Sequence, residues 1–122
     1  MRNTSTSWRV ALALLCAIVM LPVAASRADD DDDDMDAARA ALAAGDIRPL
    51  DALLAKVERE CRGRFVEMEL ERDDGLWIYE IKLLGPRGDV AELEYDARDF
   101  ALVEAEGRRL DLLDCVPPGT PD

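Results

Sequence analysis

The chain of 122 residues contains no histidine and no glutamine, and its only asparagine is Asn3. Beyond Ser26, the only residue of the serine and threonine type is Thr120. A cysteine nucleophile needs a base, usually histidine, and a zinc site needs several cysteine or histidine ligands. These absences predict a protein that is not an enzyme and that needs no cofactor.

Positive charge is also scarce, because 15 lysines and arginines stand against 27 aspartates and glutamates, for a net charge of −12. A protein that binds phosphate groups carries a basic patch or stripe, and no such stripe occurs in this sequence. The charge balance therefore argues against nucleic acid and against anionic membrane surfaces as partners.

The N-terminal residues have the pattern of a secretory signal peptide. Arg2 and Arg9 precede an apolar run, Val10–Met20, and small residues follow it. The run is shorter than the roughly 18 apolar residues that span a bilayer. We expect residues 1–28 to be removed after Ala28, with Ala25 as the alternative cleavage site. The protein is then periplasmic or secreted, with no stable membrane anchor.

Cleavage after Ala28 removes three arginines and no acidic residue, which leaves 94 residues with a net charge of −15. It also leaves two cysteines, Cys61 and Cys115. An even pair of cysteines in an exported protein usually forms a disulfide. The sequence therefore predicts a Cys61–Cys115 disulfide.

The mature chain begins with a run of aspartates. A block of like charges repels itself and buries no apolar surface, so residues 29–35 are expected to form a disordered acidic arm. The same run is a weak candidate for a metal site, because it lacks the alternation with glycine that shapes calcium loops. These candidate metal ligands are Asp29, Asp30, Asp31, Asp32, Asp33 and Asp34.

Two segments have helical patterns. The alanine-rich segment Met35–Ala44 predicts a short helix that ends at Gly45. A second helix is expected over Pro49–Arg62, because its apolar residues repeat with helical spacing on one face. The residues of this apolar stripe are Leu50, Leu53, Leu54, Val57 and Cys61.

After Gly63 the hydrophobic period changes to two residues, which is typical of half-buried strands. The turn sequences Asp73-Asp74-Gly75 and Gly85-Pro86-Arg87-Gly88 separate the first three strands, and Leu102–Glu106 brings the number of strands to three or four. The residues expected on the sheet side of the core are Val66, Met68, Trp77, Tyr79, Ile81, Leu93 and Tyr95.

The predicted fold class is α+β, with one main amphipathic helix packed on a three- to four-stranded antiparallel sheet and preceded by a short helix. Such a sheet needs one face covered, and the apolar stripe of the second helix is the available cover. The domain is expected over residues 36–115. Residues 116–122, which contain three prolines, are expected to be a disordered tail.

Several stretches of the chain, within about residues 46–103, resemble a PepSY domain. They are Gly45-Asp46-Ile47-Arg48-Pro49-Leu50, Arg62-Gly63-Arg64, Val66-Glu67-Met68-Glu69-Leu70, Gly75-Leu76-Trp77-Ile78-Tyr79-Glu80-Ile81-Lys82-Leu83-Leu84, Gly88 and Tyr95-Asp96-Ala97. The family usually continues the Asp-Ala pair with a Thr-Gly turn, where this chain has Asp99-Phe100. The resemblance implies an exported helix-on-sheet domain without catalytic residues, of a kind proposed to restrain peptidases or to sense envelope conditions.

The functional expectation is a periplasmic protein that binds a protein or peptide partner, such as a peptidase or a sensor protein, through a free sheet edge. Glutamates that alternate along the strands predict an acidic sheet face, which favours a basic partner. The candidate contact residues are Glu67, Glu69, Glu71, Glu92 and Glu94. The alternative function is that of an acidic protein that binds or buffers divalent cations.

Overall fold

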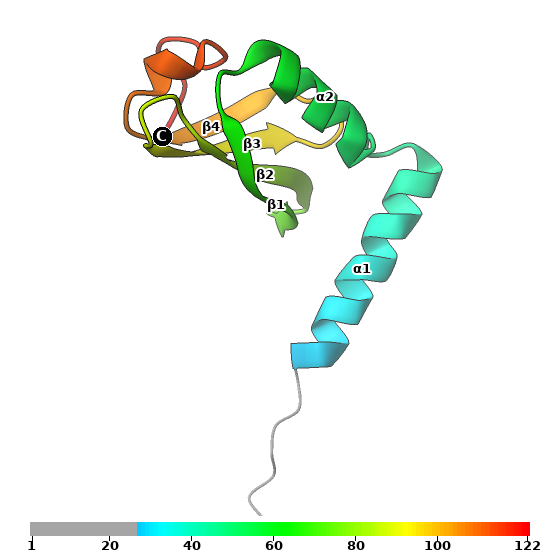
Figure 1. Ribbon diagram of the computed structural model, residues 1–122. Helices are drawn as coiled ribbons and strands as arrows, with labels where there is room; N and C mark the ends of the chain where they lie inside the picture. The colour runs from blue at the N-terminus through cyan, green and yellow to red at the C-terminus, as the bar shows by residue number, and fades with distance from the viewer. Residues whose placement is uncertain (1–26) are drawn as a thin grey trace, which may run out of the picture.

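The computed structural model describes residues 27–122, so the predicted signal peptide lies outside the described residues except for its last two. The chain forms an α+β fold in which two helices precede a four-stranded antiparallel sheet and a short 3₁₀ helix (Figure 1). The elements are α1 (Arg27–Ala44), α2 (Leu50–Glu60), β1 (Arg64–Asp73), β2 (Leu76–Leu84), β3 (Val90–Asp96), β4 (Leu102–Gly107) and η1 (Leu110–Leu113).

Helix α1 is longer than the sequence predicted. It begins at Arg27 and includes residues 29–35, for which the sequence predicted a disordered arm. Acidic residues are favourable in the first turns of a helix because they complement the helix dipole, and the alanines that follow have the highest helix propensity. Gly45 then ends the helix with φ 75°. None of the described helices is both long enough and apolar enough to cross a membrane.

Helix α2 carries the apolar stripe that its sequence predicts, and its buried residues belong to one cluster with buried residues of the sheet. Pro49 precedes its first turn, and Leu53 and Val57 are buried. The helix ends at Glu60, two residues before the predicted Arg62, because Cys61 adopts an extended conformation (φ −104°, ψ 142°). This change of direction leads the chain into β1.

The sheet is an antiparallel meander in the order β1-β2-β3-β4. Two residues, Asp74 and Gly75, join β1 to β2, and both have positive φ (45° and 81°), as hairpin turns of this length require. The turn that joins β2 to β3 lies at the predicted Gly85–Gly88 segment. Leu102–Gly107 forms the fourth strand at the opposite edge from β1.

The core lies between α2 and the face of the sheet that carries alternate residues of β2 and β3. Tyr79, Ile81, Leu93 and Tyr95 are buried there, as the sequence predicted. Burial raises the pKa of Tyr95 to about 12, while the Tyr79 hydroxyl donates a 2.8 Å hydrogen bond to the carbonyl oxygen of Arg48. The other buried apolar residues include Ile47, Leu83, Ala91, Ala97, Phe100, Ala105 and Leu113.

The expectation that Val66 and Met68 belong to the core is wrong, because their side chains are 57% and 40% exposed. A register shift between Phe65 and Glu67 leaves Val66 out of the pairing, and Phe65 packs against the core instead. Met68 pairs with the buried Ile81 and lies on the same face of the sheet. Because β1 is the edge strand, α2 does not cover Met68 and solvent reaches its side chain. Trp77, which the sequence also placed in the core, is only partly buried.

The turn between β3 and β4 is organised by Asp96. Its carboxylate accepts hydrogen bonds from the backbone N–H of Arg98 (2.9 Å) and from the Arg98 guanidinium, and these bonds lower its pKa. Phe100 has φ 61°, the left-handed conformation that favours glycine, at the position where the resembled family has glycine. Its ring is 3% exposed, and the Arg48 guanidinium lies 4.1 Å from its centre.

The residues after β4 contact α2 and the sheet again. The structure joins Cys61 to Cys115 by a disulfide, the pairing that the sequence predicts. Beyond it, residues 116–122 were expected to be a disordered tail, but the backbone N–H of Ala105 donates a 2.8 Å hydrogen bond to the carbonyl oxygen of Pro121. The tail therefore lies against β4, because a strand at a sheet edge has backbone groups that still need partners.

Candidate interaction surface

The sheet face opposite α2 is lined by glutamates from all four strands. In the pairing register, Glu69 lies opposite Glu80, Glu80 opposite Glu94, and Glu94 opposite Glu104. Like charges directly opposite each other destabilise a sheet. This row of glutamates therefore lowers the stability of the sheet. We call this surface the acidic face, formed by Glu67, Glu69, Glu71, Glu80, Glu92, Glu94, Glu104 and Glu106.

Lys82 lies in the middle of the neighbouring row, which runs Glu67, Lys82, Glu92 and Glu106. Its ammonium group is 3.3 Å from carboxylate oxygens of Glu67 and Glu80 and 3.8 Å from Glu92. The hydrogen bonds to Glu67 and Glu80 raise the pKa of Lys82. One lysine therefore faces several carboxylates, and the acidic face keeps a large excess of negative charge.

The pKa values of two carboxyl groups of the acidic face are raised. Desolvation raises the pKa of Glu94, and the neighbouring charges of Glu104 and Glu80 raise it further. Desolvation also raises the pKa of Glu71, with contributions from Glu80 and Glu69. Desolvation is the larger cause of both shifts, and the neighbouring carboxylates add a repulsion that a bound cationic group would relieve.

The structure places all five predicted contact glutamates, Glu67, Glu69, Glu71, Glu92 and Glu94, on the acidic face. Three further members of the acidic face were not among the predicted contact residues. Glu80 could have been found, because it alternates with the buried Tyr79 and Ile81. The positions of Glu104 and Glu106 depend on a register shift between Glu94 and Tyr95, which no local pattern reveals.

The aspartate run lies on α1 and not on the sheet. Asp32, Asp33 and Asp34 are exposed, and the side chains of Asp29, Asp30 and Asp31 lie outside the described residues. Among the described residues, no group of three or more histidines, cysteines or acids is arranged to hold a metal ion. Because half of the predicted ligands lie outside the described side chains, the weak metal site stays a prediction.

The two edges of the sheet differ in accessibility. Strand β1 is ten residues long and, among the described residues, pairs only with β2. Strand β4 has the tail beside it, with the hydrogen bond from Ala105 to Pro121. Only the β1 edge thus combines a row of free backbone groups with exposed carboxylates, those of Glu67, Glu69 and Glu71.

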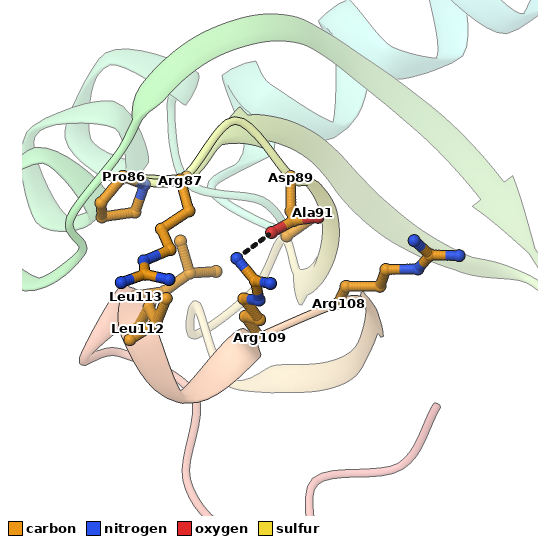
Figure 2. A pocket seen from close by; sticks show the side chains of 9 residues that line it. Pro86, Arg87, Asp89, Ala91, Arg108, Arg109, Leu112 and Leu113 are labelled. Atoms are coloured by element: carbon orange, nitrogen blue, oxygen red, sulfur yellow. Dashed lines mark ion pairs between the residues drawn. The ribbon is translucent and has the colours of Figure 1, made fainter.

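A hollow between the β2–β3 turn and η1 gathers three arginines, Arg87, Arg108 and Arg109 (Figure 2). Its volume is about 10 Å³, which is room for one water molecule. Arg109 Nη1 lies 3.5 Å from Asp89 Oδ2 across this hollow. The hollow is therefore a junction between two turns and is too small for a ligand.

Comparisons with known proteins found no match among protein-family models, curated proteins or solved structures. The likeness to PepSY domains accordingly rests on the sequence stretches quoted above.

Proposed function

We propose that this chain is an exported, non-enzymatic binding protein of PepSY type that captures a basic, extended polypeptide segment at the β1 edge. The observation that supports the proposal best is the combination of an open edge strand with the acidic face on one side of it. Backbone groups at such an edge give affinity, and the flanking side chains select the partner.

The acidic face supplies the selection for charge. An added strand places alternate side chains next to Glu67, Glu69 and Glu71, which are exposed. Lysine or arginine at those positions would pair with carboxylates whose neighbours already repel them. The segment that fits this edge therefore has basic residues at every second position.

The same charges disfavour a second copy of this chain as the partner. Antiparallel pairing of β1 with β1 of another copy would bring Glu67, Glu69 and Glu71 of one protomer next to those of the other. Like charges on an edge strand are a common protection against such self-association. The surface thus selects a foreign basic segment, such as one from the peptidase or sensor that the family resemblance suggests.

The test is a titration of the exported protein with a labelled peptide in which lysine alternates with valine, followed by fluorescence anisotropy. The edge variant Glu67→Gln/Glu69→Gln/Glu71→Gln should weaken binding about tenfold at roughly 0.1 M salt. The matched control, Glu92→Gln/Glu104→Gln/Glu106→Gln, removes three charges from the same face away from β1. It should weaken binding much less.

A second peptide of the same composition, with lysines and valines in separate blocks, separates strand addition from simple charge attraction. It should bind weakly, because its side chains cannot alternate between the two faces of a sheet. Equal binding of both peptides, or an equal loss in both glutamine variants, would contradict the proposal.

A further inference from the structure

A groove of about 390 Å³ lies between α1 and the β1–β2 hairpin. This volume is within the range of small-molecule and side-chain binding sites. Figure 1 shows α1 leaving the domain at the side where β1 and β2 turn back on each other. The residues that line the groove are Asp34, Met35 and Ala38 of α1, Glu69 and Leu70 of β1, and Trp77 of β2.

The groove is open because α2 covers only part of its face of the sheet. Leu53 and Val57 seal the centre, whereas Leu70 and Trp77 are only partly buried. Met35, on the opposite wall, is 52% exposed. Apolar side chains from three elements thus line a space that the described residues leave unfilled.

Charge at the groove points to the chemistry of its occupant. Asp34 contributes a carboxylate from α1, and the side chain of Glu69 belongs to the acidic face on the other side of β1. The Arg72 guanidinium lies 5.1 Å from the centre of the Trp77 ring, so this ring already has a cation beside it. The arrangement suits an apolar side chain whose neighbours in sequence are basic.

We propose that the groove binds one bulky apolar side chain of the segment that pairs with β1, and this inference rests on the function proposed above. Side chains of an added strand alternate between the two sides of the sheet. If basic residues lie along the acidic face, the residues between them point toward the side of Leu70 and Trp77. The recognised segment therefore has alternating basic residues and one large apolar residue at a fixed position.

The test uses a host peptide in which lysine alternates with threonine, and variants that carry a single leucine at successive threonine positions. Burial of one leucine side chain should increase affinity about tenfold, at one position only. The indole N–H signal of Trp77 in the NMR spectrum, assigned with Trp77→Phe, should shift with that peptide and not with the others.

Two tryptophan substitutions on α1 form a matched pair. Ala38→Trp fills the groove and should abolish the gain from leucine, while the host peptide still binds. Ala40→Trp adds the same side chain at an exposed position of α1 and should leave the gain unchanged. Circular dichroism of both variants checks that the fold is retained.

The outcomes separate the two proposals. If the host peptide binds and depends on Glu67, Glu69 and Glu71, but leucine gives the same affinity at every position, the groove is not a binding site and the proposed function stands. If neither the host nor any leucine variant binds, the proposed function itself fails. Loss of the gain in both tryptophan variants also contradicts the assignment to the groove.

Discussion

The two edge strands of this sheet are protected in different ways. At β4, the chain supplies its own cover, because the tail accepts the hydrogen bond of Ala105 and the Cys61–Cys115 disulfide fixes the segment that precedes the tail. At β1, no described segment pairs with the free side, and the protection is the charge of Glu67, Glu69 and Glu71.

This difference teaches which edge can accept a partner. A covered edge can be opened only by displacing the chain's own segment. An edge protected by charge repels acidic strands and copies of itself, but it remains available to a basic strand. The proposed binding therefore belongs to the β1 edge, whereas at the β4 edge the tail already occupies the backbone N–H of Ala105.

The disulfide joins the end of α2 to the segment between η1 and the tail. It spans 54 residues, and in the chain-entropy model a loop of this length contributes about 4 kcal/mol to the free energy of unfolding. The double variant Cys61→Ser/Cys115→Ser should lose about this amount in urea unfolding. Amide exchange should increase most around β4 and η1. A loss of stability with equal deprotection of β1 would contradict the link between the disulfide and the β4 edge.

The second prediction compares the free energy lost when a side chain is truncated in the covered part of the inner sheet face with that lost in its uncovered part. Leu53 is fully buried under the sheet, and Leu53→Ala should cost about 3 kcal/mol because it leaves a cavity. Met68→Ala is the matched truncation at the open edge, where the side chain is 40% exposed. It should cost well under about 1 kcal/mol. Similar losses in the two variants would show that α2 protects the whole face.

Much of the fold could be predicted because its signals are local. The apolar stripe with Leu53 and Val57 predicted α2, and Asp74-Gly75 predicted the hairpin turn. Which residues of the inner sheet face are buried could not be predicted in the same way, since this depends on where α2 lies over the sheet. The bulge that exposes Val66 is likewise set by pairing between strands, and the strict alternation in the sequence conceals it.

The candidate site divides in the same way. Glu67, Glu69 and Glu71 share a face because they alternate within one strand, and this is visible in the sequence. The row that continues to Glu104 depends on the register shift between β3 and β4. The groove beside Trp77 depends on the position of α1. The sequence predicted the N-terminal part of α1 to be disordered, so it gave no sign of this groove.

Removal of the tail tests the covered β4 edge directly. Truncation after Val116 removes the carbonyl oxygen of Pro121, so the free energy of unfolding should fall by about 1 kcal/mol. The Ala105 amide should lose its protection from hydrogen exchange, while amides of β1 keep their exchange rates. Unchanged protection of Ala105 would mean that the tail does not close this edge.

The smallest expected effect comes from the charges of the acidic face. Because the pKa values of Glu71 and Glu94 are raised in the folded protein, the folded state binds protons more tightly than the unfolded chain. Stability should therefore increase as the pH falls from neutral toward 4.5, the ordinary pKa of these groups. Below this range it should decrease again as Asp96, whose pKa is lowered from 3.8, becomes protonated and loses its bonds to Arg98.

Glu94→Gln isolates this effect, because Glu94 lies between Glu80 and Glu104. Removal of one charge from two like-charged pairs should stabilise the protein by about 0.5 kcal/mol at pH 7 and flatten the rise in stability toward acid. Glu58→Gln, at an exposed position of α2, removes the same charge away from the sheet and should do neither. If both variants gained equally, the relevant quantity would be the net charge of the whole chain. A gain specific to Glu94 would instead indicate that repulsion is concentrated on the acidic face, where a basic segment at the neighbouring β1 edge would relieve it.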